Sequence, residues 1–199
     1  DGIDLLTELG ALEERSGRKT GASRSRTVLT RQGRLMARIP LDPRLSRMLI
    51  EARQEGCLPE IIVLAGALSI QDPRERSGET LQEADRVLSQ FQSPHSDFIT
   101  LLRIWERFGQ ERNRVKSTGG LKRFCRAHFL SFRRMREWQD ICEQVEQVLE
   151  ECGFEISGPG GADEPRQWEA LAPGHPLYDR LHRSLLSGFL SNIAVRKER

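Results

Sequence analysis

The sequence is poor in aromatic side chains, which make up 6% of its 199 residues, and it has no long uncharged apolar run. A helix that crosses a bilayer needs roughly 18 or more consecutive apolar residues. No segment approaches that length and no secretory signal is visible, so we expect a cytoplasmic protein that makes no membrane contact. The chain opens at Asp1 without a methionine, and we expect it to be part of a longer polypeptide.

The cysteines and histidines lack the spacing of a metal site. Cys57, Cys125, Cys142 and Cys152 form no CxxC pair, and the four histidines are dispersed. Zinc sites use closely spaced Cys and His ligands. The sequence therefore predicts reduced, mostly buried thiols and no metal, and it predicts His128, on an apolar helix face, to be a core residue.

Catalytic motifs are also missing. No GxxxxGK[ST] loop for nucleotide phosphates occurs, and Gly17-Arg18-Lys19-Thr20 has its lysine one place late without an upstream glycine or strand. There is no GxSxG motif and no convincing pair of acids for proton transfer. We therefore predict that this chain is not itself an enzyme and holds no cofactor.

What is present indicates a mainly α protein, and the first quarter predicts short helices around a basic loop. Thr30 and Asp42 are side chains that cap helix N-termini, Pro43 suits a first helical position, and Gly56 suits a helix end. Residues 13–26 carry five arginines and lysines and no large apolar side chain, so they are predicted to be a mobile loop or wing. This combination suggests a small winged-helix domain.

The rest of the chain predicts a helical bundle. Residues 57–70 are nearly all apolar, and their length favours a helix buried on all sides. Thr80 and Glu83 have the spacing of a capping box for the next helix. Residues 158–165 are rich in Gly, Asp and Pro and are predicted to be a linker. Apolar side chains then recur at helical spacing in four stripes, over 98–108, 121–132, 135–152 and 178–189.

Charge is sharply divided along the bundle. Residues 103–136 contain eleven Lys and Arg and two acids, a local net charge of +9, whereas residues 137–164 contain nine acids and no cation. With the helix continued from residue 122 to 133, a helical wheel places Lys122, Arg126 and Arg133 on one stripe, opposite Phe124 and Phe132. Such a stripe can bind the phosphates of a single strand, or it can be a solvated face that pairs with the acidic helix. The candidate nucleic-acid-binding residues are Lys122, Arg123, Arg126, Arg133, Arg134, Arg103, Arg112, Arg114 and Lys116.

Several segments together resemble one family, and the resemblance covers nearly the whole chain. Residues 5–12 and 29–44 look like the winged helix of DEAH-box helicases. Residues 68–76, 96–102 and 129–140 look like the bacterial HrpA branch of that family. Residues 182–193 resemble the entry into the family's OB-fold.

The resemblance implies a winged-helix domain over 1–54, a ratchet-like helicase-associated bundle over 55–170, and a final helix with the entry to a missing OB-fold over 171–199. It implies that single-stranded RNA moves 3′ to 5′ along the bundle while RecA-like motor domains of the same polypeptide hydrolyse ATP with Mg²⁺. The basic insert 15–26 departs from the family, in which many members have a tight turn. It can contact RNA or be disordered, and we favour disorder.

Two other functions are compatible with the residues alone. A free-standing winged-helix DNA-binding regulator would read base edges, for which Arg31, Gln32 and Arg34 are the candidates. A helical protein–protein adaptor would bind protein partners only, and the cations of its basic stripe would form ion pairs with its own acidic helix.

Overall fold

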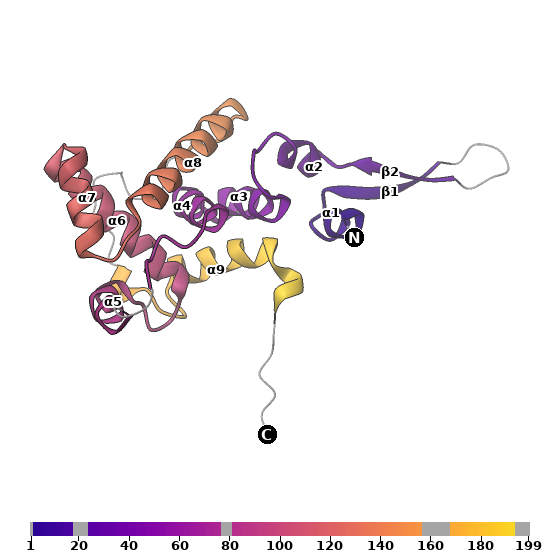
Figure 1. The fold of residues 1–199 in the computed structure, drawn as a ribbon. Helices are drawn as coiled ribbons and strands as arrows, with labels where there is room; N and C mark the ends of the chain where they lie inside the picture. The colour runs from indigo at the N-terminus through magenta and orange to yellow at the C-terminus, as the bar shows by residue number, and fades with distance from the viewer. Residues whose placement is uncertain (1, 18–23, 77–80, 157–167, 194–199) are drawn as a thin grey trace, which may run out of the picture.

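The computed structural model describes residues 2–17, 24–76, 81–156 and 168–193, and within them the prediction of a mainly α protein is confirmed. One antiparallel pair of strands lies near the N-terminus, and the rest of the described regular structure is helical (Figure 1). The elements are α1 (Gly2–Glu8), β1 (Leu12–Gly17), β2 (Arg24–Leu29), α2 (Arg31–Met36), α3 (Pro43–Glu55), α4 (Leu58–Ser69), α5 (Leu81–Leu88), α6 (Asp97–Val115), α7 (Thr118–Ala127), α8 (Phe132–Glu151) and α9 (Pro176–Gly188).

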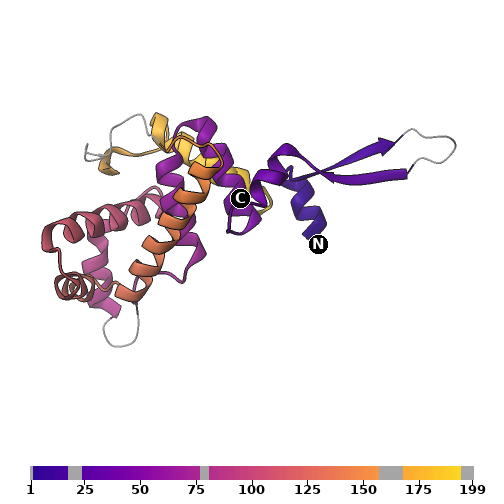
Figure 2. The same ribbon diagram turned by 90° about the horizontal axis from the view of Figure 1, so that it is seen from above.

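The predicted basic loop is largely a hairpin. β1 and β2 pair in register from Leu12 opposite Leu29 to Gly17 opposite Arg24, and they extend away from the helices (Figures 1 and 2). The expectation of a mobile, disordered 15–26 segment is wrong for residues 15–17 and 24–26, because these flanks satisfy each other's backbone groups across the ladder. Residues 18–23 lie outside the described residues.

The predicted caps are confirmed where the structure describes them. The hydroxyl of Thr30 accepts from the Gly33 N–H at 2.9 Å and donates to the Gly10 carbonyl at 2.7 Å. The carboxylate of Asp42 accepts from the Arg44 N–H at 2.9 Å, and Gly56 ends α3 with φ +70°. The expected capping box at Thr80 and the linker 158–165 lie outside the described residues.

α4 is the buried helix that its sequence predicted. It packs against α3, α6, α8 and α9, and Ile61, Ile62 and Leu64 have no exposed surface. The indole N–H of Trp138 on α8 donates to the Val63 carbonyl of α4 at 2.7 Å. α4 therefore holds the bundle together, with α8 on one side and α9 on another.

α3 connects the N-terminal hairpin region to the bundle. It contacts α2 on one side and packs along α9 and α4 on the other. A Cβ added at Gly188 of α9 would lie 2.4 Å from the Arg44 carbonyl oxygen, so the backbones of the two helices approach each other closely there. α3 thus packs against both the N-terminal hairpin region and the bundle, so these contacts mark no division between two domains. The domain boundaries at residues 54 and 170 stay predictions.

The stripe over 121–132 is not one helix. α7 ends at Ala127, and Phe129 adopts a left-handed conformation with φ +51°. The Leu130 N–H donates to the Cys125 carbonyl at 2.9 Å and the Phe129 N–H to the Arg126 carbonyl at 3.3 Å, which is the Schellman pattern of a helix end. Phenylalanine occupies the position that usually needs glycine, so the residue types gave no stop signal.

Candidate nucleic-acid interface

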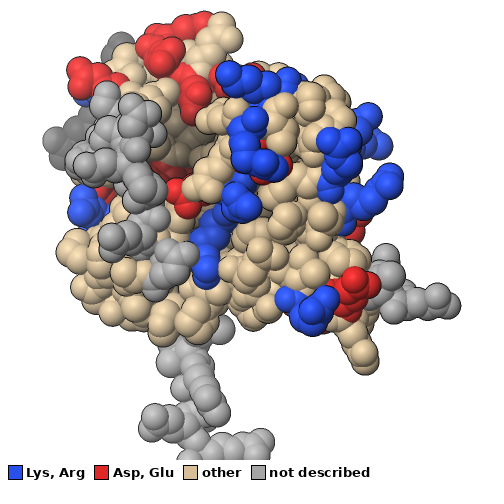
Figure 3. All heavy atoms as spheres, turned by 90° about the vertical axis from the view of Figure 1, so that its left-hand side faces the viewer, with Lys and Arg blue, Asp and Glu red and all other residues tan. Residues whose placement is uncertain are grey.

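Helices α6, α7 and α8 form one end of the molecule, and most of the predicted cations lie on them. Lys116 ends α6 with φ +45°, and the Ser117 hydroxyl accepts from the Gly120 N–H at 3.2 Å to begin α7. This tight turn folds α7 back beside α6 (Figure 1). The space-filling view of this end shows Lys and Arg atoms running down the face, with carboxylates gathered near its upper edge (Figure 3).

Two hollows lie between α7 and α8. The first, of about 420 Å³, is lined by Glu75, Lys122, Cys125, Arg126, Phe129, Leu130 and Phe132. The second, of about 480 Å³, is lined by Arg112, Lys116, Ser117, Thr118, Leu121, Phe132 and Arg136. Phe132 borders both, so the two hollows adjoin, and we call them together the α7–α8 furrow.

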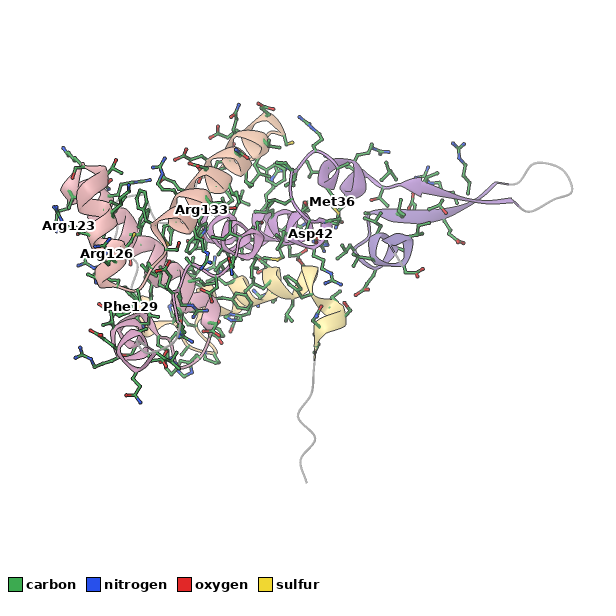
Figure 4. The ribbon with its side chains drawn as sticks, viewed as in Figure 1. Met36, Asp42, Arg123, Arg126, Phe129 and Arg133 are labelled. Atoms are coloured by element: carbon green, nitrogen blue, oxygen red, sulfur yellow. The ribbon has the colours of Figure 1, made fainter. Side chains whose placement is uncertain are left out.

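Four predicted cations line the furrow: Arg112, Lys116, Lys122 and Arg126. All four side chains are exposed, and none forms an ion pair with a carboxylate of the described residues. Lys122 and Arg126 lie one helical turn apart on α7, and Figure 4 shows Arg126 on its outer side with Phe129 at the turn below. The furrow therefore presents uncompensated positive charge to solvent.

The helical-wheel expectation for Phe132 is wrong. It placed the ring opposite the cations, whereas the Lys122 ammonium lies 5.4 Å from the centre of the half-buried Phe132 ring. The reason is the chain reversal after α7, which puts Phe132 on a different helix that faces α7 across the furrow. Arg133 and Arg134 leave the α7 stripe for the same reason, whereas Phe124 is buried as expected.

Three of the predicted cations make structural contacts instead. Arg134 donates to the Asp72 carbonyl at 2.9 Å and to the Gln71 side chain at 2.6 Å. Arg103 donates to the Gln90 and Gln92 carbonyls. The guanidinium of Arg114 binds the nearly buried Glu111 carboxylate at 2.7 Å, and this hydrogen bond lowers the pKa of Glu111.

Arg123 and Arg133 are exposed and line neither hollow of the furrow. Arg123 borders a third hollow of about 330 Å³ between α6 and α7, together with Arg107 and Phe124. Figure 4 shows Arg123 on α7, above Arg126, and Arg133 at the start of α8. They extend the positive surface on either side of the furrow.

The acidic half of α8 does not neutralise the furrow. Among the described residues, its only ion pair with the basic segment 103–136 joins Asp140 to Arg136, one turn away at 3.7 Å. Burial raises the pKa of Glu146, and the neighbouring carboxylates of Glu143 and Glu150 raise it further. These acids therefore crowd one another at the other end of the helix.

The one thiol that lines the furrow is buried and not activated. Cys125 forms part of its floor, and burial, with a further contribution from the Glu75 charge, raises the pKa of this thiol to about 12. The described residues contain no group of His, Cys, Asp and Glu that could hold a metal ion, and none of their helices is long and apolar enough to cross a membrane. The half-buried His128 directs its Nδ1 to the Phe124 carbonyl at 2.8 Å, as a core histidine would.

Sequence reasoning missed three contributors to the furrow. Arg136 was counted in the basic segment but not among the candidates, and Phe129 was assigned to an apolar helix face. Glu75 had no signal at all, because it comes from the segment after α4 and meets α7 only through tertiary contacts. The Glu75 N–H donates to the Phe129 carbonyl at 2.7 Å, and this hydrogen bond holds the segment after α4 against the end of α7.

The N-terminal region offers little for reading base edges. Gln32 donates to the Leu9 carbonyl at 3.1 Å and Arg34 to the Leu29 carbonyl at 3.1 Å, so two of the three candidates hold the hairpin in place. α2 has only six residues. Recognition helices place several free side chains in the major groove, and α2 leaves only Arg31 exposed without such a contact among the described residues.

A two-stranded hairpin and short helices thus lead into a helical bundle with a basic furrow, and comparison with known proteins identifies the class of this arrangement. The family described as helicase associated domain (HA2), ratchet-like, matches residues 42–101. The chain is 37% identical over 98% of its length to the ATP-dependent RNA helicase HrpA of Escherichia coli, and 38% identical over 99% to its homologue in Haemophilus influenzae.

A more distant relative is the Schizosaccharomyces pombe pre-mRNA-splicing factor ATP-dependent RNA helicase prp22, 30% identical over 85% of the chain. The chain spans only 13%, 14% and 13% of these three proteins. The chain belongs to the HrpA-type branch of the DEAH-box helicases and corresponds to their helicase-associated region. The residues of the furrow on α7 and α8 lie beyond the matched range 42–101.

Proposed function

We propose that this chain is the RNA-binding accessory region of a cytoplasmic, ATP-dependent 3′–5′ DEAH-box RNA helicase. Its α7–α8 furrow holds single-stranded RNA while RecA-like domains of the same polypeptide, beside an OB-fold, hydrolyse ATP with Mg²⁺. The observation that carries this proposal is the set of four exposed cations in the furrow, Arg112, Lys116, Lys122 and Arg126, none of which forms an ion pair with a carboxylate of the described residues. The names of the relatives agree with it.

The physical role of the furrow is passive. Phosphates bind Lys and Arg without regard to sequence, and each contact releases counterions from the strand. A strand held in this way can slide from one set of cations to the next when the motor domains move. Four cations on α6 and α7 are enough to orient a strand along the furrow but not to hold it irreversibly.

Charge reversal at two of these cations tests the proposal. The affinity of the 199-residue chain for a labelled single-stranded RNA is measured by fluorescence anisotropy over a range of salt concentrations. Lys122→Glu and Arg126→Glu are each expected to weaken binding of every sequence and to reduce the slope of log K against log salt by about 0.7 per lost contact. Arg86→Glu is the matched control, because Arg86 is exposed on α5 and lines neither hollow.

The other candidate functions predict different results. An unchanged affinity and salt slope in both furrow variants would contradict the proposal. A tight, sequence-specific complex with duplex DNA would favour the winged-helix regulator. Failure of the chain to bind any strand at low salt would favour the protein adaptor.

A further inference from the structure

The first hollow of the furrow contains a carboxylate among its cations. Glu75 is exposed beside Lys122 and Arg126 but lies within 4 Å of no cationic nitrogen among the described residues. A site that bound only phosphate would gain nothing from this group, since a carboxylate repels phosphate and has no proton to donate. Its occupant should therefore carry hydrogen-bond donors as well as phosphate.

The backbone holds Glu75 firmly in this position. Arg74 forms a β-bridge with Leu130, the Glu75 N–H donates to the Phe129 carbonyl at 2.7 Å, and the Ser131 N–H donates to the Pro73 carbonyl at 2.8 Å. The segment after α4 is thus fastened to the turn between α7 and α8. This pairing places the Glu75 side chain next to Phe129, although the two residues are far apart in the sequence.

Phe129 is held in a conformation that a side chain rarely adopts. Its φ of +51° at the end of α7 is the position at which glycine is most common. A non-glycine residue is strained in this conformation, and such strain clusters at functional sites. The Phe129 ring is half-buried and forms a wall of the hollow rather than part of the fully buried core.

We propose that this hollow binds one unstacked guanine of the RNA strand. The base stacks on Phe129, and its N1–H and N2–H groups donate to the two carboxylate oxygens of Glu75. Lys122 and Arg126 bind the phosphates on either side of this nucleotide. The inference rests on the proposed function, because it requires that the furrow hold a single strand.

Guanine is the base whose edge fits a carboxylate. Its Watson–Crick edge has a ring N–H beside an amino group, so it can donate two parallel hydrogen bonds to an acceptor pair. Adenine and cytosine place an acceptor nitrogen beside their amino group, and uracil places carbonyls on both sides of its N–H. Unstacked bases of single-stranded RNA are read on this edge while they stack on aromatic side chains. The volume of about 420 Å³ lies within the range of about 300–1,000 Å³ typical of small-ligand sites.

The test compares three labelled RNA strands on the complete 199-residue chain: oligouridine, the same strand with one central guanosine, and the same strand with inosine there. Inosine keeps N1–H but lacks the N2 amino group. A bidentate contact is worth about 1–3 kcal/mol of discrimination, so the guanosine strand should bind about fivefold or more tightly than oligouridine. The inosine strand should lose most of that gain.

Variants assign the preference to the hollow. Glu75→Gln should remove the guanosine preference without weakening the binding of oligouridine, because it removes a negative charge. Phe129→Leu keeps an apolar side chain and should weaken the binding of the guanosine strand by about fivefold, the loss of one stacked base. Glu83→Gln on α5, an exposed carboxylate outside the hollow, is the control and should keep the preference.

The outcomes separate the two proposals. Equal binding of the three strands, or a guanosine preference that survives Glu75→Gln, would overturn the guanine site and leave the furrow as a nonspecific track. If the chain binds none of the strands at low salt, the proposed function and this inference both fail.

Discussion

Two helical glycines differ sharply in what surrounds them. A Cβ added at Gly66 of α4 would lie 2.8 Å from the Cys142 Sγ and 2.9 Å from the Trp138 ring, whereas one added at Gly109 of α6 would meet nothing within 4 Å. Gly66 lets α8 approach the central helix closely. Gly109 has no such neighbour and only adds freedom to the unfolded chain.

Alanine at each glycine should therefore have opposite effects on stability. Gly66→Ala is expected to lower the free energy of unfolding by about 1–3 kcal/mol, the cost of overpacking a core. Gly109→Ala is expected to raise it by about 0.5–1 kcal/mol, because alanine favours the helix and restricts the unfolded chain. Urea denaturation followed by circular dichroism measures both; a stable Gly66→Ala variant would mean that α4 and α8 are not tightly packed.

At the scale of elements, the turn between α6 and α7 combines strain with charge. Lys116 ends α6 with φ +45° and its side chain lines the second hollow. Lys116→Gly should raise the free energy of unfolding by about 0.5–1 kcal/mol, because glycine adopts this conformation without strain. The same change should weaken RNA binding and lower its salt slope by about 0.7.

Lys116→Gln is the matched control for that turn. It removes the charge but keeps the strained side chain, so it should weaken binding equally without a gain in stability. If both variants gained stability, the charge rather than the backbone would be the source. Denaturation and anisotropy on the same two proteins distinguish these results.

How far the sequence predicted these elements depended on whether their signals were local. The caps at Thr30 and Asp42 and the apolar run of α4 are local, and the structure confirms them. The end of α7 was missed because Phe129 stands where glycine would have marked the stop. The hairpin was anticipated only as one of two options, a mobile loop or a wing. The bounds of its strands were not predicted, because polar residues such as Glu14 and Thr27 pair through their backbones, which composition does not reveal.

The candidate site was predictable in its charge but not in its shape. The net charge of residues 103–136 located the correct end of the molecule, and four predicted cations line the furrow. That Arg134 and Arg103 bind backbone carbonyls follows from contacts with distant segments, which no spacing reveals. Glu75 reaches the furrow by such a contact as well.

α3 and α9 are joined by an ion pair that makes stability depend on pH. The guanidinium of Arg183 on α9 binds the Glu55 carboxylate of α3 at 2.7 Å, and this hydrogen bond lowers the pKa of Glu55 below its usual 4.5. A lowered folded-state pKa contributes stability above pH 4.5, and that contribution is lost as pH falls through the folded value.

Glu55→Gln should therefore destabilise the protein more at neutral pH than at an acidic pH below the lowered folded-state pKa, where Glu55 of the unmodified chain is protonated in both states. The free energy of unfolding in urea at the two pH values measures the difference. Glu137→Gln, which removes an exposed carboxylate with no ion pair among the described residues, serves as the reference. An equal loss at both pH values would mean that the charge of Glu55 does not contribute.

At the scale of the whole molecule, the near-neutral total charge hides two poles. The basic pole is the furrow with its neighbours on α6 and α7, and the acidic pole is the second half of α8, including Glu143 and Glu150. From Arg133 to Glu150 a helix rises about 25 Å, at about 1.5 Å per residue. This length exceeds the screening length of about 8 Å at physiological salt but not that of about 30 Å at 0.01 M.

Removing the acidic charges should therefore strengthen RNA binding only when screening is weak. Glu143→Gln with Glu150→Gln is expected to raise the affinity for single-stranded RNA at about 0.01 M salt and to leave it unchanged at about 0.15 M. The pair should also stabilise α8, because both carboxylates repel that of Glu146 and Glu150 lies in the last turn, at the negative end of the helix dipole. Binding is compared only where both proteins are fully folded, because salt also screens the effect of these charges on folding. A gain in affinity confined to low salt then reports the long-range field, whereas an equal gain at both salt concentrations would mean that the acidic pole lies in the path of the strand itself.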